Sequence, residues 1–377
     1  MSADALSKPG GAPHLVAHPI RVMLVDDSAV VRGMVARWLS SEAGIVIAAS
    51  CMNGKIAVGA VERAQPDVIV LDIEMPEMDG LTALPLLLAK APAAKIIMAS
   101  TLTLASAEVS LRALTMGATD TIGKPSSVAA ADAGEQYRRE LIQKIRALGQ
   151  PKQVSHSVSA VAGKEHGPSG PSTGSRVLRP ISAVRPKVLC IGSSTGGPQA
   201  LNALFEALPR KIGLPILVTQ HMPPKFTTIL AEHLGRAAQR PSQEARDGAV
   251  LQPDHIYVAP GDKHLLVQRK GADGVAQLNA GPPENYCRPA VDPMFRSAAA
   301  VYGAATLGVV LTGMGHDGRN GAQAIAAAAG TVIVQDEASS IVWGMPGAVA
   351  QAGLASGIYP LKALAGEAAK IISGGKP

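Results

Sequence analysis

The chain has 377 residues, a formal net charge of +6, 47% hydrophobic residues and 17% charged residues. This length exceeds one typical domain, and the composition is that of folded globular domains rather than of a disordered chain. Only 3% of the residues are aromatic, so the composition argues against a surface that stacks successive nucleic-acid bases on aromatic rings.

The cysteines and the N-terminal segment point to the compartment. Cys51, Cys190 and Cys287 lie far apart, and their odd number and spacing argue against a disulfide framework and a zinc site. Residues 1–20, which we expect to be disordered, lack the basic start and apolar core of a signal peptide. No apolar run approaches the roughly 20 residues of a membrane helix. We therefore expect a cytoplasmic protein without membrane insertion.

Apolar runs alternate with amphipathic stretches between residues 21 and 147. This alternation predicts a parallel sheet covered by helices on both faces. Ligands bind such doubly wound sheets at the carboxyl ends of the strands. The expected strands are 22–25, 45–49, 68–71, 95–99 and 119–122, and the expected helices begin near Ala29, Gly54, Gly80, Ala105 and Asp132.

Polar side chains stand at the ends of four of these strands. Asp26 and Asp27 close the first strand, Asp72 closes the third, Ser100 follows the fourth and Lys124 follows the fifth. Crowded carboxylates repel one another unless a cation neutralises them, and their hard oxygens suit Mg²⁺. A hydroxyl and an ammonium group are suited to recognising a phosphorylated aspartate. Helix capping would explain a single acid, but the pattern over four strand ends favours a phosphoryl site.

With these residues, the segment 21–147 resembles the receiver domain of response regulators, which has a flavodoxin-like fold. The resemblance implies that Asp72 is phosphorylated by a histidine kinase and that Ser100 and Lys124 form the switch. Thr121 stands where the family usually carries an aromatic switch residue, so the sequence departs from the family pattern at that position. The Mg²⁺ site implied by the resemblance consists of Asp26, Asp27, Asp72 and the backbone carbonyl of Glu74.

A change of composition follows the first domain. Segment 148–186 is rich in Ser, Gly, Pro and Val and has no helical or strand periodicity, which is typical of a flexible linker. Six basic residues and one acid between positions 151 and 187 carry +5 of the net +6 charge, and a solvated tether is the favoured interpretation over a nucleic-acid site. They are Lys152, Lys164, Glu165, Arg176, Arg179, Arg185 and Lys187.

Strand–helix alternation resumes after the linker, in residues 187–373, and again predicts an α/β domain. A short meander is expected at 264–268 and 275–279. The expected strands are 188–191, 216–219, 256–259, 307–311 and 331–334, and the expected helices begin near Pro198, Lys225, Asp292, Gly318 and Met345.

A glycine-rich turn links the first strand and helix of this second half. Gly192 and Gly196 frame Ser194 in a Gly-x-Ser-x-Gly pattern, which can present a serine hydroxyl on a sharp corner. Glycine permits backbone angles that other residues avoid. The same turn could instead bind a phosphate, or Ser193 or Ser194 could cap the helix.

A nucleophilic serine needs a base and a group that orients the base. His221 follows the strand 216–219 and Asp317 follows the strand 307–311, so the three candidates end parallel strands on one rim. The chain order Ser, His, Asp differs from that of α/β-hydrolases, but triads are defined by geometry. Asp317 could also cap the helix at Gly318. The competing histidines are His233, His255, His264 and His316.

Residues 187–373 resemble the catalytic domain of the CheB family of chemotaxis protein-glutamate methylesterases, a Rossmann-like fold. The resemblance implies that Ser194 is the nucleophile, His221 the base and Asp317 the orienting acid. The matching stretches are Ile-Gly-Ser-Ser-Thr-Gly-Gly (191–197), Thr-Gln-His-Met-Pro-Pro (219–224), Ala-Pro-Gly-Asp (259–262), Cys-Arg-Pro-Ala-Val-Asp (287–292), Leu-Thr-Gly-Met-Gly-His-Asp-Gly (311–318) and Trp-Gly-Met-Pro (343–346).

The same resemblance implies a function. The expected substrate is a glutamyl methyl ester on a methyl-accepting chemoreceptor, with receptor glutamine deamidation as a second activity. No cofactor is expected for the ester chemistry. Backbone amides near Thr195 and Met314 would stabilise the oxyanion, and Arg288 would either contact the receptor or form a structural ion pair. In the family, the receiver covers the active site until it is phosphorylated.

Two other classes of function remain as alternatives. A DNA-binding regulator would need a basic recognition helix, whereas the excess positive charge lies in the linker. A non-catalytic adaptor would use the glycine-rich turn to bind a nucleotide, and it would not form an acyl-enzyme on Ser194.

Overall fold

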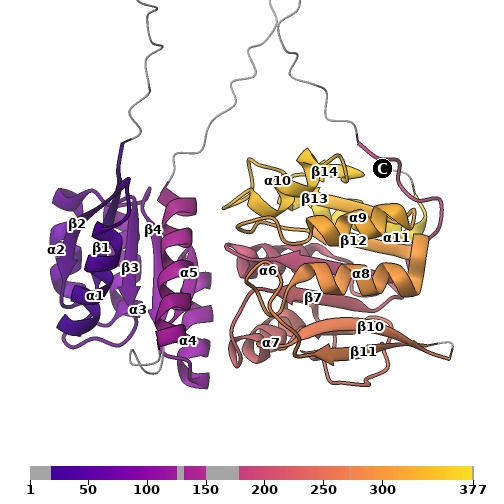
Figure 1. Ribbon diagram of the computed structural model, residues 1–377, viewed down its shortest axis with the longest axis horizontal. Helices are drawn as coiled ribbons and strands as arrows, with labels where there is room; N and C mark the ends of the chain where they lie inside the picture. Colours follow the sequence, from indigo (N-terminus) through magenta and orange to yellow (C-terminus); the bar gives the residue numbers. More distant parts are fainter. Residues whose placement is uncertain (1–17, 125–130, 150–177, 272, 376–377) are drawn as a thin grey trace, which may run out of the picture.

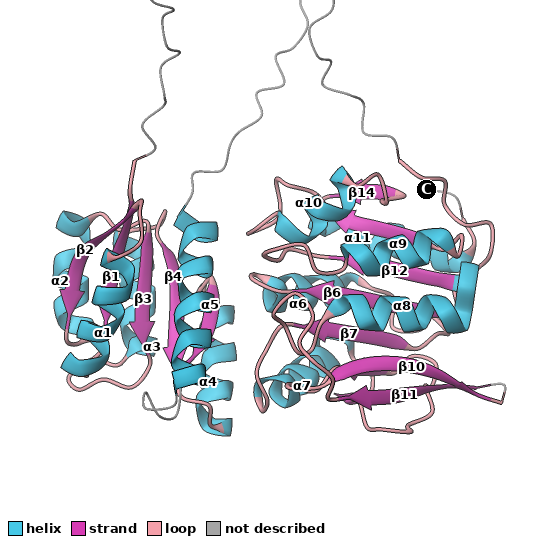
Figure 2. Ribbon diagram, in the orientation of Figure 1, coloured by secondary structure: helices cyan, strands magenta, loops and turns pink. Residues whose placement is uncertain are grey.

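The structure is a computed structural model, and it describes residues 18–124, 131–149, 178–271 and 273–375. Each half of the chain forms a parallel sheet with helices on both faces (Figures 1 and 2), so the predicted α/β fold class is confirmed. The predicted disorder of residues 1–17 and the linker segment 150–177 lie outside the described residues.

The first sheet has the strand order β2-β1-β3-β4-β5, and all its pairings are parallel. Side chains of β1 alternate between two cores, with Val22 and Leu24 on one face and Met23 and Val25 on the other. Two-sided burial is the reason that these strands read as continuous apolar runs. The strands are β1 (Ile20–Val25), β2 (Ile45–Cys51), β3 (Val68–Asp72), β4 (Lys95–Ser100) and β5 (Asp120–Gly123).

Helices α1 (Ala29–Ser40) and α5 (Ala131–Gly149) cover one face of this sheet, and α2 (Gly54–Ala64), α3 (Gly80–Lys90) and α4 (Leu104–Thr115) cover the other. Local sequence fixes where four of them begin. The residue before each helix accepts a hydrogen bond from the backbone N–H three residues later, which satisfies an otherwise unpaired donor. These capping residues are Ser28, Asn53, Asp79 and Thr103.

The second sheet has the order β14-β13-β12-β6-β7-β9-β8, and it is also fully parallel. Its central strands β12, β6 and β7 are neighbours, so their carboxyl ends meet on one rim. The strands are β6 (Val188–Ser193), β7 (Ile216–Gln220), β8 (Ser242–Glu244), β9 (Ile256–Val258), β12 (Thr306–Val310), β13 (Thr331–Gln335) and β14 (Gly357–Tyr359).

Two groups of helices enclose the second sheet. One face is covered by α6, α7 and α11, and the other by α8, α9 and α10. The predicted meander is a hairpin of β10 (His264–Lys270) and β11 (Asp273–Asn279) that packs against α8. The helices are α6 (Gly197–Ala207), α7 (Phe226–Ala238), α8 (Val291–Tyr302), η1 (Gly303–Ala305), α9 (Arg319–Ala327), α10 (Gly344–Gln351) and α11 (Leu361–Ser373).

Two differences from the sequence prediction concern edges and boundaries. The sequence did not predict the three-residue edge strands β8 and β14, because strands this short carry no periodic signal. The last helix, α11, was also not predicted. Residues 178–186, which we had assigned to the linker, are attached to the second domain. There the Arg179 N–H donates to the Ala355 carbonyl at 2.9 Å, and the Ser182 N–H donates to Thr331 Oγ1 at 3.0 Å.

The two domains contact each other through α4 of the first and α6 and α7 of the second (Figure 1). One hydrophobic cluster contains buried residues of both domains, including Leu111 of α4 and Leu230 of α7. This contact places the carboxyl-terminal rim of the second sheet beside the first domain.

Candidate functional site

The acidic cluster forms where the sequence placed it. Carboxylate oxygens of Asp26, Asp27 and Asp72 all lie within 4.8 Å of one another, because β1 and β3 are adjacent in the sheet. Lys124 Nζ lies 2.6 Å from Asp26 Oδ2 and 2.7 Å from Asp72 Oδ1. Concentrated carboxylate oxygens are the donor set that Mg²⁺ prefers, so these side chains fit the implied metal. Glu74, the fourth expected ligand, is exposed just after β3.

Asp72 is held in a tight environment at the end of β3. Burial raises the pKa of its carboxyl to about 6, Lys124 opposes this rise, and Asp26 adds to it. A Cβ atom at Gly80 would lie 2.0 Å from the Asp72 carbonyl oxygen. Glycine is therefore required where α3 begins, because its backbone passes directly beside Asp72.

The expected switch hydroxyl is tied to α4. Ser100 is buried, and its hydroxyl lies 2.9 Å from the hydroxyl of Ser110, which is also buried. Ser100 also accepts the Lys124 N–H at its carbonyl, at 2.7 Å. Thr121 is buried on β5, and its small side chain leaves the aromatic part of the expected relay without a counterpart here.

In the turn after β6, the side chain of Ser193 is hydrogen-bonded and that of Ser194 is not. Ser193 Oγ donates to Gln220 Oε1 at 2.7 Å, and Gln220 Nε2 donates to the Ser194 carbonyl at 2.9 Å. The Ser194 hydroxyl makes no hydrogen bond with the described residues. Gly196 has a φ of +74°, which favours glycine at this corner. Ser194 is therefore the serine available for chemistry.

The base and the acid meet on the same rim. His221 follows β7, and its Nε2 lies 2.7 Å from Oδ2 of Asp317, which follows β12. The other ring nitrogen, Nδ1, lies 3.4 Å from Sγ of Cys287, and among the described residues no hydrogen bond joins it to Ser194. The structure thus brings two of the three predicted residues into contact and places the third at the adjacent strand end.

Asp317 also has the capping role that we had considered, but for a different helix. Its carboxylate accepts the N–H groups of Val291 at 2.6 Å and Asp292 at 3.1 Å, which start α8, and the N–H of Gly318 at 2.9 Å. Burial opposes the charged carboxylate, but hydrogen bonds from His221 and these backbone groups outweigh it and lower the pKa of Asp317. The acid is held ionised in one orientation.

His221 titrates far from its usual range. Burial lowers its pKa, but Cys287 and Asp317 outweigh burial and raise the pKa to about 10. A general base acts in its neutral form, so activity should rise with pH as the imidazolium loses its proton. Because the folded pKa is above the unfolded value, this interaction stabilises the fold at neutral pH and is lost as the pH rises through about 10.

Cys287→Ala is expected to move the acid limb of the reaction to lower pH, because the variant loses one of the two groups that raise the pKa of His221. The measurement is the rate at which a fluorophosphonate labels the unphosphorylated chain between about pH 6 and pH 11, a range that covers both the ordinary histidine pKa and the raised pKa of His221. An acid limb that stays in place or moves to higher pH would contradict the assigned role of this thiol.

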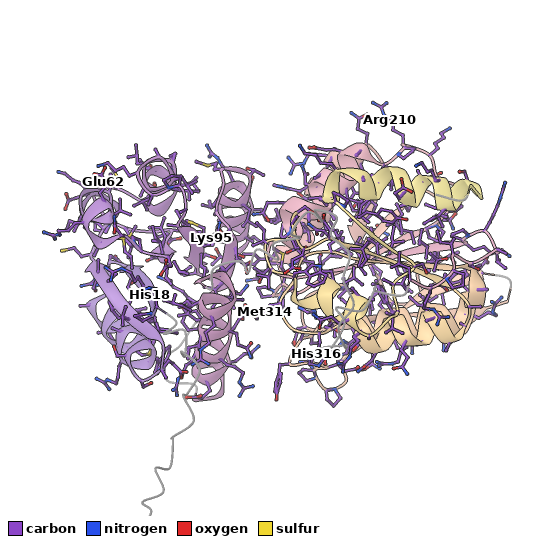
Figure 3. All side chains as sticks on the ribbon, turned by 90° about the horizontal axis from the view of Figure 1, so that it is seen from above. His18, Glu62, Lys95, Arg210, Met314 and His316 are labelled. Carbon is purple, nitrogen blue, oxygen red and sulfur yellow. The ribbon has the colours of Figure 1, made fainter. Side chains whose placement is uncertain are left out.

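The candidate oxyanion donors have free backbone amides. Within the described residues, the N–H groups of Thr195 and Met314 have no protein acceptor. Gly313 lies against Ser194, since a Cβ atom there would be 2.9 Å from Ser194 Cβ. Met314, labelled in Figure 3, lies on the side of the second domain that faces the first.

The competing histidines lie outside this arrangement. His264 is buried between the Pro282 carbonyl at 3.0 Å and the Ala290 N–H at 3.1 Å, a structural role. His316 is exposed, His255 is half-buried, and His233 lies on α7. Arg288 forms an ion pair with Asp262 at 2.5 Å. This contact supports a structural role for Arg288 rather than a contact with the receptor. Sequence reasoning missed Gln220, Asn285 and Cys287 as partners, although all three lie in or beside the matched motifs.

The first domain contacts the nucleophile turn directly. Asp120 Oδ2, at the start of β5, accepts hydrogen bonds from Thr195 Oγ1 at 2.8 Å and from Lys144 Nζ at 2.5 Å. Gln199 Nε2 donates to the Ala118 carbonyl at 2.8 Å. Ser194 itself is only 7% exposed, and the first domain bonds the residue that follows it.

Lys144→Met should lower the free energy of unfolding of the first domain by about 3–5 kcal/mol, because it leaves the buried Asp120 carboxylate without its cation. Burial opposes the charged ammonium, but Asp120 and Glu140 outweigh it and raise the pKa of Lys144, so the pair is intact at neutral pH. Urea unfolding measures the change. The exposed Lys55, paired with Glu77 at 3.8 Å, is the matched control, and an equal effect of Lys55→Met would refute the assignment.

Comparison with known proteins shows which families both halves of the chain resemble. The CheB methylesterase family matches residues 189–368, and the response regulator receiver domain family matches residues 22–132. A protein-glutamate methylesterase/protein-glutamine glutaminase of Nitrobacter hamburgensis is 49% identical over 98% of both chains. One of Rhodopseudomonas palustris is 51% identical over 94% of this chain and 95% of its own. The chain belongs to the CheB family.

Solved structures of this family resemble each half separately. The CheB methylesterase catalytic domain of Thermotoga maritima is 38% identical, and the match covers 50% of this chain and all of that one with a TM-score of 0.49. The response regulator domain of Thermotoga maritima CheB is 37% identical. The match covers 34% of this chain and 96% of that one, with a TM-score of 0.32. Among the described residues, no helix is long and apolar enough to cross a membrane.

Proposed function

We propose that the chain is a phosphorylation-activated protein-glutamate methylesterase that hydrolyses glutamyl methyl esters on chemoreceptors to glutamate and methanol. The observation that carries the proposal is the rim of the second sheet, where the free Ser194 hydroxyl stands beside a histidine bonded to a buried aspartate at 2.7 Å. The names of the relatives supply the substrate class, and the histidine-bonded acid supplies the means of activating a serine.

The chemistry follows from which ring nitrogen is free. Asp317 occupies Nε2 of His221, so Nδ1 takes the proton as Ser194 Oγ attacks the ester carbonyl. The tetrahedral intermediate collapses when the imidazolium returns this proton to the methoxy oxygen and methanol leaves. Water, deprotonated by the same nitrogen, then attacks the acyl-enzyme, and Ser194 recovers its proton as glutamate is released. His221 must exchange its contact with Cys287 for one with Ser194 before the first step.

The free N–H groups of Thr195 and Met314 would donate to the oxyanion in both tetrahedral intermediates. Deamidation of a receptor glutamine uses the same attack, with ammonia in place of methanol as the leaving group. The names of the relatives include protein-glutamine glutaminase, which supports this second activity at the same triad.

Regulation by the receiver is supported by its contact with the nucleophile turn. Asp120 bonds Thr195, the residue after Ser194, so a receptor helix would reach the serine only after this contact opens. Phosphorylation of Asp72 by a histidine kinase would be the trigger, with Ser100 and Lys124 contacting the phosphoryl group. Asp26, Asp27, Asp72 and the Glu74 carbonyl would hold Mg²⁺, which when bound supplies charge neutralisation for the phosphoryl oxygens.

The test combines turnover with covalent capture. The full chain is incubated with methylated chemoreceptor in membranes, with and without a small-molecule phosphodonor and Mg²⁺, and released methanol is measured. A fluorophosphonate probe is then mapped by mass spectrometry. We expect phosphodonor-stimulated methanol release and adduct on Ser194. The absence of both, or a shift of DNA mobility with no esterase activity, would reject the proposal.

A further inference from the structure

A strained turn lies beside the triad. Residues 284–287 close on themselves, since the Glu284 N–H donates to the Cys287 carbonyl at 3.1 Å and the Cys287 N–H donates to the Glu284 carbonyl at 2.8 Å. The two central residues are left-handed, with φ of +52° at Asn285 and +64° at Tyr286. Asparagine tolerates this conformation, but a bulky aromatic residue rarely adopts it. Contacts outside the turn must therefore hold it.

The first such contact reaches the catalytic acid. The side-chain amide of Asn285 donates through Nδ2 to Asp317 Oδ1 at 2.9 Å and to Asp292 Oδ2 at 3.0 Å. Both carboxylates are buried, and one amide group with two hydrogens lies between them. Burial and the nearby charge of Asp317 raise the pKa of Asp292, so this amide separates two groups that repel each other.

The second contact reaches the catalytic base. Cys287, the last residue of the turn, places Sγ 3.4 Å from His221 Nδ1. Among the described residues, the charged and titratable groups that face this acid–base pair are therefore Cys287, Asp292 and Arg296. Two of the three predicted triad members touch side chains of a single four-residue turn.

The third contact reaches the receiver. Tyr286 is 75% exposed, and the guanidinium carbon of Arg139 on α5 lies 5.1 Å from the centre of its ring, within the range of a cation–π interaction. On the side of the second domain, Arg296 holds Glu284 through two hydrogen bonds, at 2.9 Å and 2.6 Å. The turn is thus fixed at one end by α8 and touched at its tip by the receiver.

We propose that Asn285 is a positioning residue of the triad, which fixes the Asp317 carboxylate through its amide, and that the receiver acts on the triad through this turn by the contact of Arg139 with Tyr286. The inference rests on the proposed function, because it assigns Asp317 its role in orienting the base. It adds a residue to the site and a second route, besides the Asp120–Thr195 bond, by which docking of the receiver reaches the reacting groups.

Asn285 would act through the orientation of the Asp317 carboxylate. Oδ2 of Asp317 faces His221, and Oδ1 is fixed by Asn285 and two backbone N–H groups. Removing the side-chain donor leaves Oδ1 with its two backbone donors but takes away the amide that separates Asp317 from Asp292, so the carboxylate can shift relative to His221. Misplacement of a catalytic group by about 1 Å can reduce a rate by about 100-fold. The effect should fall on kcat, because Asn285 touches the acid and not the expected position of the ester.

Asn285→Gly tests the positioning role in the full chain with phosphodonor, because glycine keeps the left-handed backbone and removes only the amide. We expect kcat to fall about 10- to 100-fold with KM changed less than about twofold. The ring N–H signal of His221 in ¹⁵N-histidine NMR spectra should shift. An unchanged kcat, or a raised KM with kcat retained, would overturn the assignment.

Asn285→Asp keeps the shape and the backbone preference and provides the second measurement, should the glycine variant fold poorly. A third carboxylate beside Asp292 and Asp317 should lower the rate more at high pH than at low pH, because the protonated carboxyl of the variant can again donate a hydrogen bond. The ratio of variant to wild-type rate should rise as the pH falls. A ratio independent of pH would refute the role of the donor.

Arg139→Gln tests the route from the receiver. Without phosphodonor we expect methanol release to rise about 2- to 5-fold, the change that an exposed cation–π pair supplies, and with phosphodonor no change. Arg138 is the matched control, because it pairs with Glu42 and Glu135 on the receiver itself. Equal effects of Arg138→Gln and Arg139→Gln would overturn this part of the proposal.

Different results would reject the proposed triad and the positioning role of Asn285. If Ser194→Ala keeps its methanol release, the triad itself is wrong and the proposed function fails. If Ser194→Ala is inactive while the Asn285 variants match the wild type in kcat and in the pH dependence of their rate, only the positioning role fails.

Discussion

Ser194→Ala should reduce methanol release from methylated receptor by about 10⁴-fold or more, even with phosphodonor present. The variant has no Oγ to attack the ester, while the receiver and its proposed phosphorylation site, Asp72, are unchanged. The residual rate would come from the oxyanion donors and substrate binding alone. The measurement is methanol release under saturating phosphodonor, with phosphorylation of Asp72 followed in the same samples.

Ser193→Ala is the matched control, one residue away on the same turn. The Ser193 hydroxyl is committed to Gln220, so its loss should reduce stability by about 1 kcal/mol and leave most of the activity. If the alanine at 193 abolished methanol release while the alanine at 194 did not, the nucleophile would be reassigned.

A fragment of residues 178–377 should hydrolyse methyl esters at least about 10-fold faster than the unphosphorylated full chain, because it lacks the receiver that we propose to inhibit the site. The factor corresponds to a closed form that makes up about 90% or more of the resting population. Phosphodonor should not stimulate the fragment, which lacks Asp72. A fragment no faster than the unphosphorylated full chain would contradict inhibition by the receiver.

The starting point of this fragment matters. A shorter fragment, 187–377, loses the hydrogen bonds of Arg179 and Ser182 to the second domain. We expect it to have the same activity per folded molecule and a lower Tm. Thermal unfolding of the two fragments side by side measures the contribution of residues 178–186.

Much of this architecture was visible in the sequence because the strands are long, apolar and parallel. The rule that functional groups collect at the carboxyl ends of such strands placed Asp26, Asp72, Ser194, His221 and Asp317 on their rims before any coordinates. The short edge strands β8 and β14 were missed, because three residues leave no room for a pattern.

The partners of the triad could not be predicted in the same way. Asn285 and Cys287 lie on an irregular turn, and their contacts with Asp317 and His221 span 32 and 66 residues of sequence. No periodicity encodes such a contact. The bond between Asp120 and Thr195 likewise depends on how two separate sheets pack together. The local signal in the sequence was an asparagine, a residue that tolerates the left-handed conformation, two residues before the matched stretch that starts at Cys287.

The apolar character of the contact between α4 and α7 has a thermal consequence. Association through apolar surface weakens on cooling, because its driving force near room temperature is largely entropic. The resting enzyme should therefore leak more at low temperature than at high temperature, relative to its fully stimulated rate. Under the proposed inhibition by the receiver, the basal methylesterase activity would therefore make up a smaller share of the stimulated activity as the temperature rises.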